Sequence, residues 1–222
     1  MKKLSAMLMA GAMMMSLAAC GSSASSASSE AVSSEAASSE VASASSEAAS
    51  AAELTTVTPG KLTMSTNAAF PPYESTDDNG NFIGIDIDVA AAIAEKLGLE
   101  LQVDDMDFDA ALLAAQNGKS DMVMAGVTVT EDRQLVMDFS DSYATGIQSI
   151  IVKEDSDIAS PDDLADKMIG TQRGTTGYIY CSDDFGDEHV TPYDNGLTAV
   201  QALVNGQVDA VVIDNAPAKE FV

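Results

Sequence analysis

Positive charge is scarce in this sequence. It has 10 Lys and Arg residues against 35 Asp and Glu residues, which gives a formal net charge of −25 at pH 7. After Lys2 and Lys3 the basic residues form no cluster. Surfaces that bind nucleic acid, or anionic lipid by electrostatic attraction, are built from clustered Lys and Arg. We therefore expect no nucleic acid partner and no polybasic membrane surface.

Cysteine and histidine are also rare, with two cysteines and one histidine. Cys20 lies in the N-terminal segment, so Cys181 cannot belong to an intrachain disulfide framework. Zinc sites and nucleophile–histidine catalysis need more residues of these types. We expect no metal and no cofactor. Cys181 follows aromatic and apolar residues in a predicted helix, and we interpret it as a packing residue rather than a reactive thiol.

No apolar run is long enough to cross a bilayer. The apolar segment 4–19 follows Lys2 and Lys3 and is shorter than the roughly 20 residues that a spanning helix needs. This pattern predicts a secretory signal peptide over residues 1–19. The segment 17–21 (LAACG) resembles the lipobox of bacterial lipoproteins, which implies that Cys20 becomes the acylated first residue of an extracytoplasmic, lipid-anchored protein. An ordinary cleaved signal with a coincidental cysteine is the alternative.

Residues 20–53 consist almost entirely of Ser, Ala and Glu, with no aromatic and no basic residue. Such a composition cannot bury enough apolar surface to offset the entropy of ordering, so we expect a disordered tether after the acylated cysteine. A nascent helix is the alternative. About 170 residues remain, enough for one large domain or two small lobes.

The first part of this remainder alternates between strand and helix patterns. The apolar spacing and the turn residues predict strands at 61–66, 99–103 and 121–125 and helices at 85–97 and 108–116. A βαβαβ order implies a parallel sheet with right-handed crossovers. We assign this first lobe to residues 54–143.

A second unit follows over residues 144–222. We predict strands at 147–152, 168–171 and 208–213, a helix start at Ser160 and Pro161, a helix from about residue 175 and another over 197–204. Two α/β lobes in sequence are the simplest account. Because ligands of such folds bind outside the carboxyl ends of strands, candidate site residues are sought there.

Three groups of motifs lie at these positions. They are 66–74 (TNAAFPPYE) with 82–88 (FIGIDID), then 106–109 (MDFD) with 125–133 (AGVTVTEDR) and 138–140 (DFS), and finally 170–177 (GTQRGTTG) with 208–214 (VDAVVID). In this order they resemble bacterial extracellular solute-binding proteins of family 3, which include the glutamine- and the lysine/arginine/ornithine-binding proteins. The likeness runs from residue 61 to residue 222.

The resemblance implies a periplasmic-binding-protein-like fold of type II, in which two lobes hold a ligand in a cleft. It implies a monomer that captures a polar amino acid, delivers it to an ABC permease and ATPase, and catalyses no reaction. The family continues through further strands and helices after the point matched by Val222, so we expect the C-terminal part of the fold to be missing. The ligand contacts it assigns are Asn67, Phe70, Phe108, Ala125, Gly126, Thr128, Arg133, Gln172, Thr175, Thr176 and Asp214.

Two of these residues have charged roles. The resemblance places Arg133 on the ligand carboxylate, and a predicted N-cap at Thr130 puts it in a first helical turn, where free amides also favour an anion. A surface arginine paired with a neighbouring acid is the alternative. Asp214 is matched to the acceptor of the ligand ammonium, and its alternative is a strand-end aspartate that caps the next helix.

The remaining residues bear on specificity. Phe70 and Phe108 are matched to aromatic walls that enclose the ligand side chain. Asn67 and Gln172 are neutral amides where relatives often carry charge, which favours a neutral polar ligand such as glutamine, although acids elsewhere could admit arginine, lysine or histidine. Two other functions share this architecture. One is a cyclohexadienyl-dehydratase-like enzyme, and the other is an amino-acid sensor domain, which requires a transmembrane helix that we do not find in the sequence.

Overall fold

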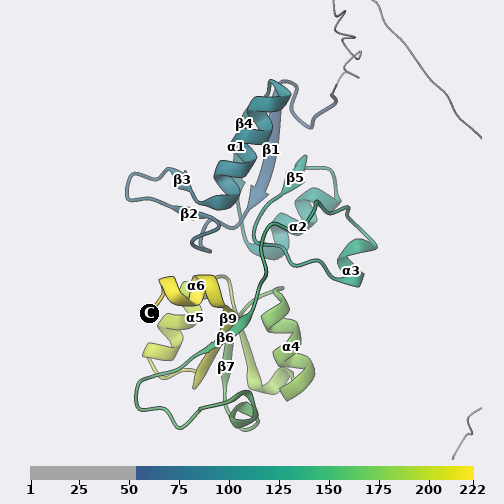
Figure 1. The fold of residues 1–222 in the computed structure, drawn as a ribbon. Coiled ribbons are helices and arrows are strands. Elements are labelled where there is room, and N and C mark those ends of the chain that lie inside the picture. Colours follow the sequence, from purple (N-terminus) through teal and green to yellow (C-terminus); the bar gives the residue numbers. More distant parts are fainter. Residues whose placement is uncertain (1–53) are drawn as a thin grey trace, which may run out of the picture. The chain divides into compact units, whose positions relative to one another are not determined.

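A computed structural model of the chain describes residues 54–222 (Figure 1). The predicted signal peptide 1–19, the acylation site Cys20 and the tether 20–53 lie outside the described residues. The folded part contains a three-stranded sheet, a two-stranded sheet and a four-stranded sheet. We call the part built on the three-stranded sheet the first lobe and the part built on the four-stranded sheet the second lobe.

The sheet of the first lobe has the strand order β4-β1-β5, and its strands are β1 (Lys61–Thr66), β4 (Glu100–Asp105) and β5 (Met122–Val123). Both pairings of β1 are parallel, as predicted. The crossovers contain α1 (Ile85–Leu97) and α2 (Phe108–Gln116).

The two crossover helices of the first lobe, α1 and α2, cover opposite faces of its sheet. Met64 packs with Ile87 and Ala90 of α1, whereas the hydroxyl of Ser65 donates to the carbonyl of Ala111 in α2 at 2.9 Å. Neighbouring residues of a strand point to opposite faces, so β1 is buried on both sides. The strand therefore ends inside the protein, and its last residues lead directly into the site.

A short hairpin was not predicted. It consists of β2 (Ser75–Thr76) and β3 (Phe82–Ile83), which pair antiparallel. The carboxylate of Asp77 accepts the backbone N–H groups of Asn79 and Asn81, each at 2.8 Å. This side chain closes the turn by local hydrogen bonding, which favours an Asp at that place.

The sheet of the second lobe has the order β6-β9-β7-β8. Strand β7 (Ile169–Gln172) is parallel to β8 (Val190–Tyr193) and to β9 (Ala210–Asp214), whereas β6 (Gln148–Ile151) is antiparallel to β9. The longer helices are α4 (Thr176–Phe185) and α5 (Gly196–Val204), as predicted, and α6 (Asn215–Glu220) follows β9. We did not predict β8 or α6.

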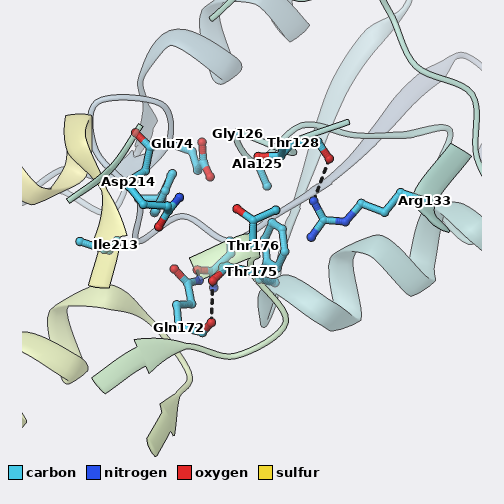
Figure 2. Close-up of a pocket in the computed structure, with 14 residues that line it drawn as sticks. Glu74, Ala125, Gly126, Thr128, Arg133, Gln172, Thr175, Thr176, Ile213 and Asp214 are labelled. Carbon is cyan, nitrogen blue, oxygen red and sulfur yellow. Dashed lines mark hydrogen bonds between the residues drawn. The ribbon is translucent and has the colours of Figure 1, made fainter. Parts of the chain in front are cut away.

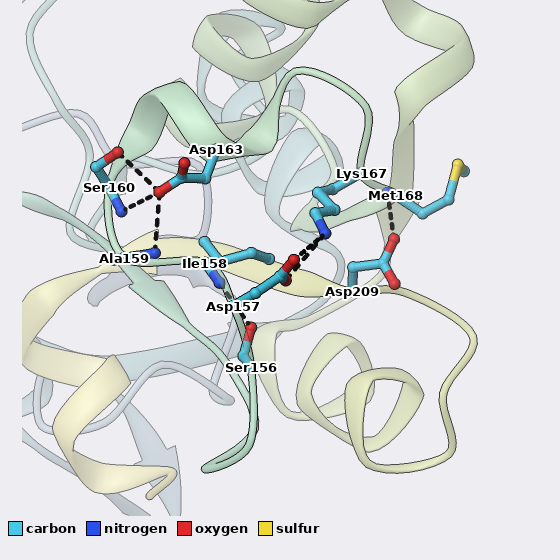
Figure 3. Close-up of polar contacts among 9 residues, drawn as sticks. All are labelled: Ser156, Asp157, Ile158, Ala159, Ser160, Asp163, Lys167, Met168 and Asp209. Carbon is cyan, nitrogen blue, oxygen red and sulfur yellow. Dashed lines mark hydrogen bonds and ion pairs between the residues drawn. The ribbon is translucent and has the colours of Figure 1, made fainter.

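The predicted helix at Ser160 is only a single 3-10 turn, η1 (Pro161–Leu164). The Asp163 carboxylate accepts hydrogen bonds from the backbone of Ala159 and from both the N–H and the hydroxyl of Ser160 (Figure 3). Ser160 and Asp163 thus form a capping box at the start of this turn. Lys167 then pairs with Asp157 at 3.0 Å as the chain turns into β7.

The core of the second lobe has two apolar clusters, one of which contains Cys181 with Leu164, Ile169 and Val190. Cys181 is buried, and this burial raises the pKa of its thiol to about 11. The structure therefore supports its interpretation as a packing residue.

Between residues 54 and 222, no helix is both long enough and apolar enough to cross a membrane.

Candidate ligand-binding site

The ligand-binding residues predicted from the sequence all line one pocket. It encloses about 450 Å³ that no protein atom fills, part of which is open solvent. Figure 2 shows these side chains converging from both lobes. Three lining residues were not among the predicted ones, namely Glu74, Gln148 and Ile213.

The sheets explain why residues so distant in sequence meet. Asn67 directly follows β1, Gln172 is the last residue of β7, and Asp214 is the last residue of β9. The carboxyl ends of parallel strands lie at one edge of a sheet, which is where ligands bind in folds of this kind. The pocket therefore lies where each sheet presents its strand ends.

Arg133 is the buried cation of this pocket. Thr130 caps the short helix α3 (Glu131–Gln134) by accepting the backbone N–H of Arg133, as predicted. The guanidinium donates to the carbonyl oxygen of Thr128 at 2.8 Å and to that of Gly174 at 3.0 Å. It also lies 5.5 Å from the ring centroid of Phe108. Because only 9% of Arg133 is exposed, its charge is available to the pocket rather than to solvent.

The start of α4 forms another side of the pocket. The Thr175 hydroxyl accepts the backbone N–H of Tyr178 and donates to the carbonyl of Gln172 at 2.8 Å. Thr176 is the first residue of the helix and is buried. Free amides at a helix start favour an anionic group, so this side of the pocket has the same preference as Arg133.

Asn67 and Gln172 face each other across the pocket. The Asn67 amide nitrogen donates to the carbonyl of Met106 at 2.9 Å, which fixes its side-chain oxygen toward Gln172. The Gln172 nitrogen donates to that oxygen at 2.9 Å. The side-chain oxygen of Gln172 takes no part in this contact, and it is buried without a hydrogen-bond partner among residues 54–222.

Asp214 combines both roles considered from the sequence. One of its oxygens accepts the backbone N–H of Ala216 and so caps α6, while the side chain also lines the pocket. A Cβ atom at Gly146 would lie 2.6 Å from its other oxygen, so a larger residue at that position would displace the Asp214 carboxylate. Burial raises the pKa of Asp214 above its ordinary value.

Glu74 is the last residue of the motif 66–74, and no role was predicted for it. It is 1% exposed and lies against Asp86, which is fully buried in the first turn of α1. Burial is the largest cause that raises the pKa of Glu74 to about 10, and the Asp86 charge and the hydrogen bond to Asp86 add to it. An acid next to apolar and proline residues was the only signal that sequence reasoning could have used.

The fold is that of bacterial amino-acid-binding proteins with two α/β lobes. The family model for "Bacterial extracellular solute-binding proteins, family 3" matches residues 62–216, and the chain belongs to that family. The resemblance stated from the motifs is therefore confirmed, and so is the fold class.

Named relatives bind amino acids. A "Probable histidine-binding protein" of Neisseria gonorrhoeae is 36% identical over 74% of this chain and 63% of its own length. The arginine-binding extracellular protein ArtP of Bacillus subtilis is 33% identical over 72% of this chain and 64% of its own length. The arginine-bound form of a truncated ArgBP from T. maritima is 41% identical with a TM-score of 0.71, over 73% of this chain and 77% of that chain. The match thus spans slightly less than two thirds of the two curated relatives.

Proposed function

We propose that this chain is the substrate-binding component of an ABC importer, which captures a polar amino acid outside the membrane and delivers it to a permease. The observation that carries the proposal is that one pocket holds a buried guanidinium, Arg133, and a partly buried carboxylate, Asp214. Every free amino acid presents a carboxylate and an ammonium group. The two protein charges are complementary to that pair, and a low-dielectric pocket strengthens both contacts.

The other lining residues complete the proposed site. Arg133 is held by two main-chain carbonyls, so its remaining N–H groups are oriented before a ligand arrives. Thr128, Thr175, Thr176 and the backbone at Ala125 and Gly126 surround the carboxylate end. Phe70 and Phe108 flank the side chain and exclude water. Asn67 and Gln172 lie with them in the same pocket.

The test is calorimetric titration of the full chain with L-arginine, L-histidine and L-glutamine, followed by mass analysis of the ligand after incubation. We expect at least one of them to bind and to be recovered unchanged. If none binds, the proposed function is wrong. If the bound molecule is converted, the chain is an enzyme and not a transport protein.

Delivery to a permease is tested by uptake. Uptake of the bound amino acid by cells lacking the gene should fall, and unchanged uptake contradicts transport.

The location proposed for the chain follows from its N-terminal segment. We propose that residues 1–19 are a signal peptide, that Cys20 carries the lipid anchor and that 20–53 is the tether of a monomer whose lobes span 54–143 and 144–222. Cys20→Ser should release the protein from the membrane fraction. A single acyl chain binds only marginally, so this expectation assumes multiple acylation. Retention of the Cys20→Ser protein in that fraction would contradict the anchor.

A further inference from the structure

Glu74 is the most deeply buried acid that lines the pocket. Apart from its contact with Asp86, neither of its oxygens has a hydrogen-bond partner in the described part of the chain. A buried carboxyl group without partners costs free energy unless it is neutral or is compensated by a ligand. The protein therefore maintains an unsatisfied acidic group next to its ligand site.

Asp86 explains how Glu74 is held when no ligand compensates it. One Asp86 oxygen accepts the backbone N–H of Gly126 at 2.9 Å and the hydroxyl of Tyr143 at 3.0 Å. The other oxygen has no such donor among residues 54–222. A hydrogen bond between Glu74 and Asp86 raises the pKa of Glu74 and lowers that of Asp86, and such a bond needs a proton on one of the two carboxyl groups. Two facing carboxyls in a buried site hold one proton between them, because both cannot be ionised at low cost.

The groups around this carboxyl pair do not neutralise its charge. Tyr73 and Tyr143 are neutral phenols whose pKa values burial raises further, and Asp214 is another acid. Arg133, the cation of the same pocket, is not among the groups that shift the pKa of Glu74 or of Asp86. Among the described residues, the Glu74–Asp86 pair therefore has no cation that compensates its charge.

The other unsatisfied atoms in the pocket are also acceptors. The side-chain oxygens of Gln148 and Gln172 are both buried without a partner among the described residues. A ligand side chain that satisfies these oxygens together with Glu74 must carry several N–H donors. A guanidinium has five and an ammonium has three.

We propose that Glu74 receives the positively charged side chain of a bound amino acid, and that binding expels the proton which Glu74 shares with Asp86. This inference rests on the proposed function and names the ligand class of its site. Charges and protons balance in this exchange. The ligand arrives with its positive charge and keeps it. The O–H bond of Glu74 breaks, the Glu74 carboxylate pairs with the ligand, and one proton leaves to solvent.

The exchange makes affinity depend on pH in a defined direction. The free protein must lose a proton from a group whose pKa is about 10, and this loss becomes easier as the pH rises. For one proton released, affinity for the cation strengthens by up to about tenfold per pH unit. A neutral ligand of the same shape does not require ionisation, so its affinity should not follow this slope.

Calorimetry with L-arginine and L-citrulline tests the proposal, because citrulline replaces the guanidinium by a neutral urea. Titrations of the full chain in phosphate and in Tris, between about pH 6.5 and about pH 8, give the number of protons released from the dependence of the heat on the buffer. We expect more than about half a proton per arginine and a rising affinity with pH, and neither for citrulline.

Glu74→Gln keeps the size of the side chain and cannot ionise. We expect this variant to bind arginine without proton release and without the pH slope, whereas Glu95→Gln, which removes an exposed acid on α1, should behave like wild type. Arginine binding by wild type with less than about half a proton, or a slope that survives in Glu74→Gln, overturns the inference. Binding of citrulline or glutamine but not arginine overturns it while leaving the proposed function intact. Failure of arginine, histidine and glutamine all to bind overturns both.

Discussion

Gln172 donates a 2.9 Å hydrogen bond to Asn67, a residue 105 positions earlier in the chain. A second bond between the lobes runs from Arg133 to the carbonyl of Gly174 at 3.0 Å. Both bonds join a residue of the first lobe to the end of β7 or the loop after it. The pocket is therefore bounded by direct contacts between the lobes, and the same side chains that we propose for ligand binding make those contacts.

Arg133→Ala should weaken amino-acid binding by roughly 100-fold to 3,000-fold. Removing one member of a desolvated, hydrogen-bonded charge pair costs about 3 to 5 kcal/mol, largely because the partner is left unpaired, and each 1.4 kcal/mol is about tenfold in affinity. Arg133→Lys should recover only part of the loss, because an ammonium cannot reproduce two parallel hydrogen bonds. Calorimetric titration with the amino acid that wild type binds measures both variants.

Arg173→Ala is the matched control for this prediction. Arg173 lies next to a predicted site residue, but its side chain is 48% exposed and pairs with Asp194 only at 3.8 Å. Its removal should change affinity by less than about threefold, since exposed ion pairs contribute little. A folded Arg133→Ala protein that binds within about threefold of wild type would remove the central residue of the proposed site.

Asp214→Asn should weaken binding while leaving the unfolding temperature close to that of wild type. The substitution removes the negative charge proposed for the ligand ammonium. It keeps the cap of α6, because asparagine is as good an N-cap as aspartate. Titration and thermal unfolding of one preparation separate the two effects. Equal losses of affinity and stability would show that Asp214 acts only as a cap.

The predictable part of the fold is the part with regular apolar spacing. The boundaries of β1, α1 and α2 were predicted as the structure has them, because their buried residues recur at strand or helix periods. Strand β8 was missed because Pro192 lies within its four residues and interrupts a strand pattern. The start expected at Ser160 is present as a capping box, but the 3-10 turn that follows ends after four residues.

The candidate site was predicted through motifs, and its unpredicted members show the limit of that approach. Arg133 follows a cap and Asp214 ends a strand, and both features are visible locally. The importance of Glu74 depends on Asp86, which comes from a different element. The preference inferred from Asn67 and Gln172 also has a different physical basis in the structure, since the two amides bond to each other and leave only an oxygen for a ligand.

Gly84→Ala should destabilise the protein far more than Gly80→Ala. Both glycines have positive φ, 83° for Gly80 and 128° for Gly84, and at ψ 175° the Gly84 backbone lies in a region that is almost exclusive to glycine. A Cβ at Gly84 would also collide with the carbonyl of Tyr73, whereas a Cβ at Gly80 meets nothing within 4 Å. Chemical denaturation of both variants measures the combined cost of the backbone strain and the collision at Gly84. Equal losses of stability would show that the backbone between Tyr73 and α1 yields freely.

Glu74→Gln should stabilise the ligand-free protein, and the gain should increase with pH. The pKa of Glu74 is about 10 in the folded protein against an ordinary value of 4.5, so the folded state binds this proton more tightly than the unfolded chain. The resulting contribution to stability is complete below about pH 4.5 and is lost progressively as the pH rises toward about 10. Glutamine does not titrate and avoids that loss.

Thermal unfolding of wild type, Glu74→Gln and the exposed control Glu95→Gln at about pH 5, 7 and 9 measures the difference. We expect the Glu74→Gln curve to separate progressively from wild type as the pH rises from about 5 to about 9, while Glu95→Gln stays parallel to wild type. A constant difference across this range would show that Glu74 is ionised in the folded protein, and that Asp86 does not hold its proton.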